Sequence, residues 1–304
     1  RGLGDVYKRQ ACKLINNNNI KTMKKLSNFV WLLAIALGAA IALTACSKNS
    51  DGPDGGEDKG KVEVNPTKVF VNGMPKIVDG SVFTRDFKGR LSSIYNREEN
   101  VLIAFAYTSS ILGTKDVPNV VMTVTDADER TVYNLFLNKD GFVKYCDEID
   151  YEEKGNTPKT TTWNFEYNSD GQLIKAVQSK DGVKTSSTIA YNDGDAVETV
   201  TMSEKDGKET DHYRIYYTSK KVTLPIENRG CIMSFDVALG LDLDHLHGAY
   251  YAGMLGKATK HLPIYNMDKD NDKTTFDWTF NNNGFPTKIV VKSDDEREES
   301  NIVW

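Results

Sequence analysis

The most distinctive chemical group in this sequence is the thiol of Cys46, which ends the run Leu43-Thr44-Ala45-Cys46. An apolar stretch, Phe29 to Leu43, leads into this run and follows the basic pair Lys24-Lys25. A basic start, an apolar stretch of roughly 7 to 15 residues and small residues before the cleavage point define a secretory signal. A Cys directly after the small residues is typical of a lipoprotein signal, in which the thiol takes a diacylglyceryl group. We therefore predict lipid attachment at Cys46.

Two other interpretations of this segment are a transmembrane helix and a coincidental Cys. The apolar stretch is short for a helix that crosses a bilayer, which needs about 20 apolar residues. Two or three acyl chains on one Cys, at about 0.8 kcal/mol per buried CH2, anchor a protein stably. The sequence thus predicts a membrane partner through Cys46 and a place at the outer membrane, on its periplasmic face or at the cell surface.

Two segments have the residue types of a metal site. Asp268-Lys269-Asp270-Asn271-Asp272 resembles the start of a calcium loop, but Lys273 and Thr279 occupy the places of the required Gly and Glu. In Asp242-Leu243-Asp244-His245-Leu246-His247 the two His are two residues apart, so they would not share a helix face, and no third ligand is evident. A solvated turn and structural His are the favoured interpretations, and we predict no metal and no cofactor.

Catalytic patterns are not evident in the sequence. It has no nucleophile elbow around a Ser or Cys and no Gly-rich phosphate loop. Its many acids allow accidental carboxylate pairs, but none stands in a distinctive setting. We predict a protein that is not an enzyme, with no catalytic residues to name, and keep a glycan hydrolase with an unrecognised carboxylate pair as an alternative.

Aromatic residues are frequent in the segments expected to form strands, as in Trp163, Trp278 and Tyr167. On an exposed sheet face they would bind a glycan or a protein ligand. Cross-strand aromatic pairs also stabilise a sheet without any ligand, by about 0.2 to 1 kcal/mol each. Core packing is the favoured interpretation, and a carrier of apolar cargo is a further alternative.

Turn signals indicate the elements that carry these residues. Short alternating runs rich in Val, Ile, Thr, Tyr and Phe are divided by Asp-Gly pairs at 170–171, 181–182, 193–194 and 206–207. Gly takes the positive φ of a tight hairpin, and Asp before it tolerates the same region. The spacing predicts a mainly β protein, an antiparallel meander of long hairpins. Looser copies of an aromatic-turn-Gly unit recur around Gly89, Gly141 and Gly284.

One segment departs from this alternation. Leu239, Leu243, Leu246, Tyr250 and Met254 recur at spacings near three and four. This periodicity predicts one short α-helix near residues 238–254, packed on the sheet.

Composition divides the chain into four parts. We expect residues 1–22 to be a sequencing artefact or untranslated leader and 23–45 to be the signal peptide. Residues 46–65 are expected to form a flexible acidic tether and 66–304 a β-rich domain. The C-terminus of this domain is either truncated or complete. Residues 1–45 hold seven of the 38 Lys and Arg but one of the 43 Asp and Glu, so the rest has 31 basic and 42 acidic residues, a formal net charge of −11. This balance argues against nucleic acid and against electrostatic docking on anionic lipid. Cys146 and Cys231 are as readily single buried thiols as a disulfide.

Four features of the chain are similar to those of one family: the lipoprotein signal, the tether, the Asp-Gly hairpins and the stretch Tyr250-Tyr251-Ala252-Gly253-Met254-Leu255-Gly256-Lys257-Ala258-Thr259-Lys260-His261-Leu262-Pro263. With them the chain resembles a domain-of-unknown-function family of Bacteroidetes-type β-rich lipoproteins. The resemblance covers most of the chain from Cys46 onward and implies no activity. An acidic stretch soon after the lipid-bearing Cys also resembles a signal for export to the outer face of the outer membrane, although Lys48, Asn49 and Ser50 precede the first acid here. The resulting expectation is a lipid-anchored, non-enzymatic binding or structural module of the envelope.

Overall fold

The computed structural model describes residues 62–108, 117–126, 129–151, 158–293 and 296–304. These residues belong to one compact unit, Lys59–Trp304. Cys46, the signal segment and most of the tether lie outside the described residues.

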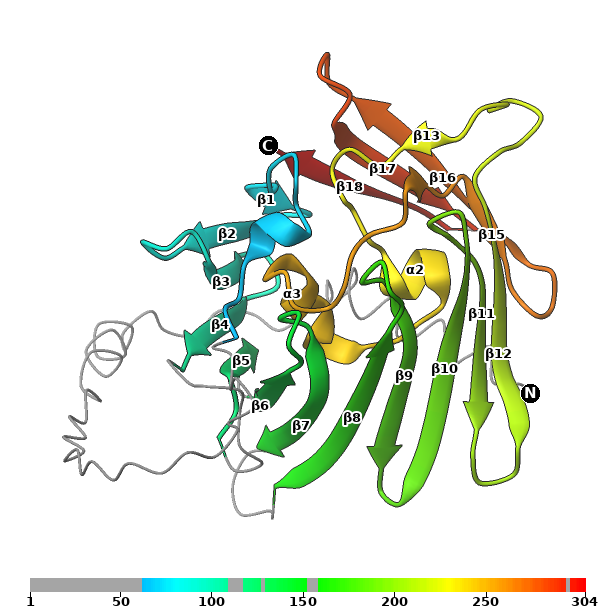
Figure 1. The fold of residues 1–304 in the computed structure, drawn as a ribbon. Helices are drawn as coiled ribbons and strands as arrows, with labels where there is room; N and C mark the ends of the chain where they lie inside the picture. The colour runs from blue at the N-terminus through cyan, green and yellow to red at the C-terminus, as the bar shows by residue number, and fades with distance from the viewer. Residues whose placement is uncertain (1–61, 109–116, 127–128, 152–157, 294–295) are drawn as a thin grey trace, which may run out of the picture. The chain divides into compact units, whose positions relative to one another are not determined.

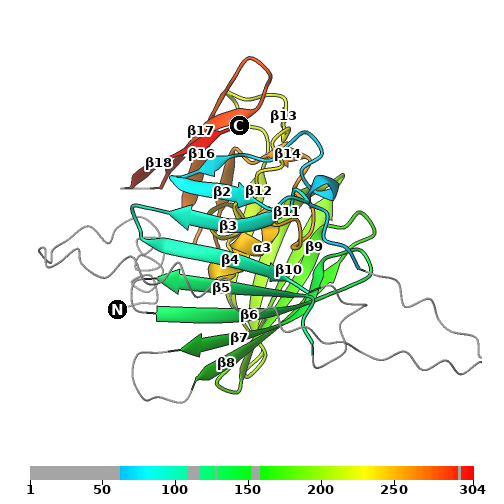
Figure 2. The same cartoon turned by 90° about the vertical axis from the view of Figure 1, so that its left-hand side faces the viewer.

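Sixteen strands form one closed antiparallel barrel (Figures 1 and 2). In chain order they are β1 (Ile77–Val78), β2 (Ser81–Arg85), β3 (Leu91–Asn96), β4 (Val101–Tyr107), β5 (Val120–Asp126), β6 (Glu129–Leu137), β7 (Val143–Tyr151), β8 (Lys159–Tyr167), β9 (Leu173–Lys180), β10 (Val183–Asn192), β11 (Asp195–Ser203), β12 (Lys208–Tyr216), β15 (Tyr265–Met267), β16 (Lys273–Phe280), β17 (Pro286–Lys292) and β18 (Arg297–Val303). Each pairs with its neighbour in sequence, except that β12 pairs with β15 and β18 returns to pair with β1. The predicted antiparallel meander is confirmed, and its closure, which the sequence did not predict, is a finding of the structure.

A smaller two-stranded sheet, β13 (Ile226–Glu227) with β14 (His261–Leu262), lies on the chain between β12 and β15. The segment between its strands carries α2 (Phe235–Leu239), the 3-10 turn η3 (Asp244–Leu246) and α3 (His247–Tyr251). A second 3-10 turn, η2 (Pro66–Lys68), precedes the barrel. None of the helices among the described residues is both long and apolar enough to cross a membrane.

Four turns at one end of the barrel are built in the same way. In each, the side-chain oxygen of an Asp or Asn accepts the backbone N–H groups two and four residues later; these residues are Asp86, Asn138, Asn168 and Asn281. The third residue after each is a Gly with positive φ, and a register shift precedes each turn. The recurring aromatic-turn-Gly unit of the sequence therefore has a physical basis, because this side-chain bond and this Gly together close a bulged hairpin. We call the end of the barrel with these turns the first end.

The helical segment lies within the ring of strands (Figures 1 and 2). Leu246, Ala249 and Met254 are fully buried and belong to one core cluster with inward side chains of the barrel wall. A Cβ on Gly248 would approach Ile103 to 3.1 Å, so α3 is pressed against β4. The barrel interior is thus filled by the chain itself at this level.

The predicted helix near 238–254 is present as two short helices. The first ends at Gly240, whose φ of 63° is left-handed, and the N–H groups of Gly240 and Leu241 bond back to the carbonyls of Asp236 and Phe235. This is the pattern of a helix terminated by glycine. The apolar periodicity continues past this break because the barrel buries the apolar side chains on either side of it, among them Leu239, Leu243 and Leu246.

Candidate functional site

An acidic cluster occupies the barrel interior beside the helical segment. Glu148 and Asp150 face inward from β7, and Asp236, Asp242 and Asp244 come from the helical segment. These carboxyl groups are close enough to influence one another: burial is the main cause that raises the pKa of Glu148 and of Asp236, and the charge of Asp244 adds to the shift of both. We call these five residues the interior acidic cluster. They come from parts of the chain that are about ninety positions apart in sequence.

Glu148 is the most enclosed member, with 3% of its surface exposed. The indole Nε1 of Trp163 on β8 donates to Glu148 Oε2 at 2.6 Å, and the Tyr133 hydroxyl on β6 donates to Oε1 at 3.4 Å. Burial raises the pKa of Glu148 from 4.5 to about 7, although the Trp163 bond opposes the shift. Removing a carboxylate from water disfavours its charged form, so this side chain holds a proton well above the ordinary range.

The helical segment supplies Asp236, Asp242 and Asp244. Burial, followed by the charges of Asp242 and Asp244, raises the pKa of Asp236 from 3.8 to about 6. Burial and Asp242 also raise the pKa of Asp244. Asp242 and Asp244 are nevertheless exposed, so solvent reaches this side of the cluster.

His245 and His247 flank the cluster with their ring centroids 6.3 Å apart. Burial lowers the pKa of both, which favours neutral rings. The Nδ1 of His247 is 2.8 Å from the carbonyl oxygen of Asp244, a bond within its own turn. No group of three or more His, Cys, Asp or Glu residues in the described part of the chain is arranged to hold a metal ion.

The arrangement offers two kinds of chemistry. A protonated carboxyl group such as Glu148, close to other carboxyl groups, has the components of general acid catalysis. The concentration of negative charge also attracts cations. The sequence did not reveal this cluster, because Glu148 and Asp150 alternate with apolar residues as on any half-polar strand, and only the closed barrel turns them inward.

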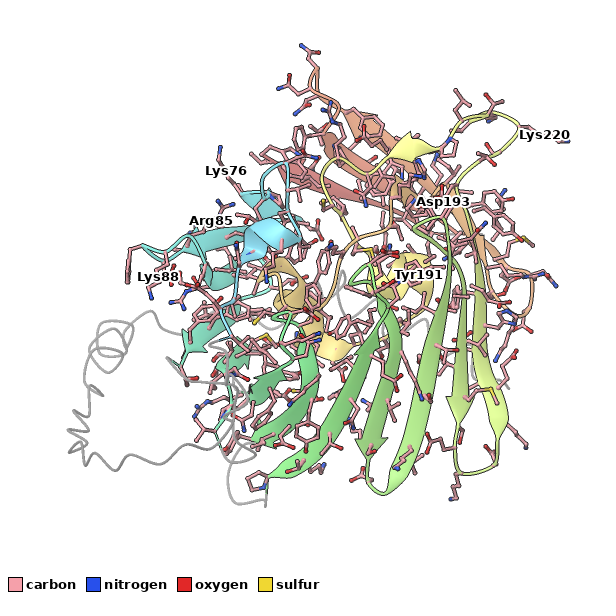
Figure 3. All side chains as sticks on the ribbon, viewed as in Figure 1. Lys76, Arg85, Lys88, Tyr191, Asp193 and Lys220 are labelled. Carbon is pink, nitrogen blue, oxygen red and sulfur yellow. The ribbon has the colours of Figure 1, made fainter. Side chains whose placement is uncertain are left out.

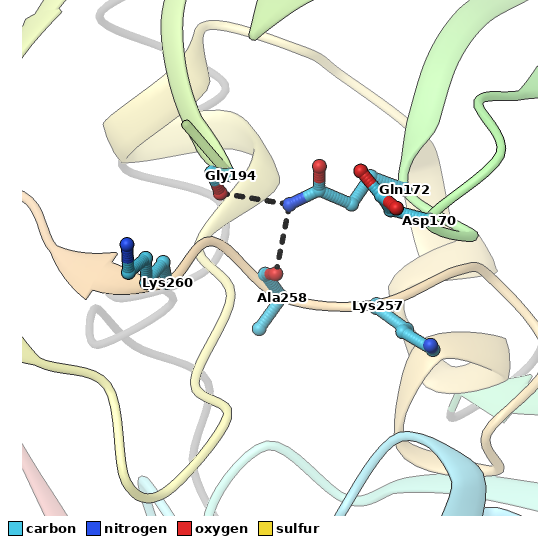
Figure 4. Close-up of a pocket in the computed structure, with 6 residues that line it drawn as sticks. All are labelled: Asp170, Gln172, Gly194, Lys257, Ala258 and Lys260. Carbon is cyan, nitrogen blue, oxygen red and sulfur yellow. Dashed lines mark hydrogen bonds between the residues drawn. The ribbon is translucent and has the colours of Figure 1, made fainter. Parts of the chain in front are cut away.

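A shallow depression of about 250 Å³ lies at the first end of the barrel (Figure 4). Its lining residues are Asp170, Gln172, Gly194, Lys257, Ala258 and Lys260. The Gln172 amide donates to the carbonyls of Gly194 and Ala258, at 2.8 and 3.2 Å. It thereby connects the β8–β9 turn to the β10–β11 turn and to the segment that leads into β14. Lys260 pairs with Asp193 at 2.7 Å. These contacts serve the fold, and the depression has no enclosed polar group facing a ligand.

The strand aromatics divide between the two faces of the barrel wall. Trp163, Tyr133 and Phe276 are 3% exposed or less and belong to the interior. On the outer face Tyr216 stacks on Tyr265 with centroids 4.4 Å apart. The predicted core role is confirmed for the interior group, and a ligand on the outer aromatic face stays a prediction.

The remaining candidates have plain structural positions. Asp268 lies in the turn between β15 and β16, where its carboxylate accepts the backbone N–H groups of Asp270 and Asp272 at 2.9 Å. Its oxygen is thus used in closing the turn. Cys146 and Cys231 are free thiols. Cys46, the predicted lipid site, lies outside the described residues.

A closed antiparallel barrel with a porin-like strand arrangement is the class of fold that these observations define. The chain belongs to the family described as a domain of unknown function (DUF4595) with porin-like fold, whose model matches residues 83–288. The predicted membership of a domain-of-unknown-function family is therefore confirmed.

Two solved structures resemble the fold. A porin-like protein from Bacteroides vulgatus ATCC 8482 has a TM-score of 0.50 and 11% identity, over 76% of this chain and 99% of that chain. A porin-like protein from Bacteroides uniformis ATCC 8492 has a TM-score of 0.48 and 20% identity, over 73% of this chain and 88% of that chain. No curated protein matched the chain.

Proposed function

We propose that this protein is a lipid-anchored envelope protein whose filled barrel is a non-enzymatic binding or structural module at the outer membrane. The observation that carries the proposal is the packed interior, in which residues such as Leu246 and Met254 fill a barrel that resembles a porin in fold. Such an interior suits a rigid body that presents its surface and its ends to partners. The lipoprotein signal at Cys46 and the porin-like Bacteroides proteins of similar fold support a place in the envelope.

The outer wall favours a barrel surrounded by water. Glu166 and Lys175 on β8 and β9 form an ion pair at 3.5 Å, and Asp277 and Lys292 on β16 and β17 form one at 2.5 Å. These side chains alternate with buried ones, so they face outward. Lys or Arg on a lipid-facing barrel wall is unfavourable, by about 2 to 4 kcal/mol each at the bilayer midplane and by less toward the interfaces. An anchor outside the barrel is therefore the means of membrane association that we propose.

Replacing Cys46 by Ala tests the anchor. We expect the full chain with Cys46→Ala, expressed in a Bacteroides-type host, to lose incorporation of labelled palmitate. We also expect less of it in the membrane fraction than of the wild type, because the thiol is the acyl acceptor. Ser47→Ala is the matched control and should be acylated like the wild type. Labelled lipid on the Cys46→Ala chain would contradict the proposal.

A glycan hydrolase is the second candidate, and one observation favours it. Glu148, with a pKa of about 7, lies near Asp150 and Asp244, and glycoside hydrolysis uses a pair of carboxyl groups of which one is a protonated acid. Against it, Glu148 is only 3% exposed. We do not favour an apolar carrier, because the inward aromatics and the helical segment form one core cluster.

A glycan array followed by product analysis separates these functions. For a binding module we expect bound glycans to remain intact, and the Glu148→Gln variant to retain the same glycans as the wild type. New reducing ends that are lost in Glu148→Gln, but kept in the outer-wall control Glu166→Gln, would establish the hydrolase instead.

A further inference from the structure

The described chain enters the barrel at its first end, beside the hairpin that joins β2 and β3. Val64 is buried in the core, and residues 66–76, which begin with the 3-10 turn η2, cross this end as a strap. The Arg85 guanidinium donates to the Met74 carbonyl at 3.3 Å, and Lys68 Nζ donates to the Asp140 carbonyl at 3.4 Å. The strap and the hairpin therefore form one continuous surface.

Basic side chains predominate on this end. The described segments that form it carry ten exposed Lys and Arg residues and five exposed Asp and Glu residues. Within the hairpin the acid is neutralised, because Asp86 Oδ2 accepts from Arg90 Nε and Nη2 at 2.8 and 2.7 Å. The charge of −11 for the chain from residue 46 thus conceals a locally positive surface.

Two apolar side chains project among these bases. Phe87 is 93% exposed and Val71 is 70% exposed, the first at the tip of the hairpin and the second in the strap. The Lys88 ammonium lies 5.8 Å from the centroid of the Phe87 ring. In Figure 3, Lys76, Arg85 and Lys88 lie along one edge of the molecule and point outward. We call Lys68, Val71, Lys76, Arg85, Phe87 and Lys88 the basic rim.

We propose that the basic rim docks on an anionic membrane surface, with Phe87 inserted at the headgroup level and the Lys and Arg side chains on lipid phosphates. Exposed aromatic residues among cations are the composition of surfaces that lie in a membrane interface. The rest of the molecule carries net negative charge, so an anionic surface repels the rest of the molecule and attracts this end.

The length of the tether makes a membrane the appropriate partner. This argument rests on the proposed anchor at Cys46, from which sixteen residues, 46–61, lead to the first described residue. For sixteen residues the random-coil relation gives an end-to-end distance of about 22 Å. The anchor would therefore hold the basic rim close to the lipid and raise its effective concentration there.

Vesicle flotation tests the docking without the anchor. The chain from residue 46 with Cys46→Ser keeps the compact unit Lys59–Trp304, which has its own core and closed sheet. It is mixed with vesicles of phosphatidylcholine alone or with about 30% phosphatidylglycerol. We expect at least tenfold greater partitioning onto the anionic vesicles at low salt, lost in high salt, because each Lys or Arg near such a surface is worth roughly fivefold.

Matched substitutions at the two ends of the barrel locate the contact. Phe87→Ser and Lys88→Glu should each reduce partitioning at least fivefold, whereas Val183→Ser and Lys184→Glu, also exposed but at the opposite end, should leave it unchanged. Equal partitioning onto both vesicle types, or equal losses at both ends, would overturn the docking. Failure of the anchor is recognised separately, by unlabelled wild type in the palmitate experiment.

Discussion

Replacing Gly240 by Ala is expected to destabilise the protein by about 3 kcal/mol or more, the largest effect of any exchange of Gly for Ala that we predict. Gly240 ends α2 with a φ of 63°, where an L residue costs roughly 1 to 2 kcal/mol. The added Cβ would also lie well inside van der Waals contact of the Tyr213 ring on β12, close to its first ring carbon as well as its edge. Overpacking of this kind costs about 1 to 3 kcal/mol more, because ring and helix must move apart.

Gly207→Ala is the matched control for this prediction. Gly207 has a φ of 65°, and nothing lies within 4 Å of its Cβ position. Its substitution should cost only the backbone strain, so the difference between the two variants in urea-induced unfolding measures the clash with Tyr213. Equal losses for Gly240→Ala and Gly207→Ala would show that α2 is not held against β12 as the structure has it.

Stability is expected to fall as the pH rises from about 4.5 to about 7, and Glu148→Gln should remove the part of this fall that Glu148 contributes. The folded protein raises the pKa of Glu148 from 4.5 to about 7, so in this range the folded state binds a proton that the unfolded state has released. The contribution is fully present below pH 4.5, is lost progressively up to about 7 and is constant above. At 1.36 kcal/mol per pKa unit, the loss is about 3 kcal/mol. Asp236 adds a fall in the same direction between its ordinary 3.8 and about 6.

Urea titrations of the wild type and Glu148→Gln from pH 4 to pH 8 provide the measurement. Gln keeps an oxygen for the Trp163 indole and has no proton to lose, so the variant should match the wild type at low pH and exceed its free energy of unfolding at pH 8. Glu166→Gln, on the outer wall, should follow the wild-type slope. A slope unchanged by Glu148→Gln would mean that another group carries the pH dependence.

The local elements of the fold could be predicted from sequence because their causes are local. The turns at Asp181-Gly182 and Asp193-Gly194 have positive φ at both residues, as the Asp-Gly pattern requires. The strands on either side follow from their alternation. The helical segment was predicted from its periodicity, but its division at Gly240 depends on the fit of that glycine against Tyr213.

The interior acidic cluster could not be predicted in the same way. Glu148 meets Trp163 and Asp244 only because β7 and the helical segment share one enclosed space. In sequence, the neighbours of Glu148 are those of an ordinary half-polar strand. The sequence marked the Asp242–His247 segment only as a possible metal site. In the structure His245 and His247 lie beside carboxyl groups, and burial lowers the pKa of both rings. Contacts between distant residues decide such a site.

The pairing of β1 with β18 has a consequence for how the protein is made. Ile77 and Val78 form bridges with Val303 and Ile302, more than two hundred residues later, so one margin of the sheet waits until nearly the whole domain has been synthesised. Until then both margins present unpaired backbone groups, which can recruit strands of other chains. Such long-range pairing is also slow to form. Closure of the barrel is therefore the last pairing that the order of the chain allows, and its two margins stay open to other strands until β18 is in place.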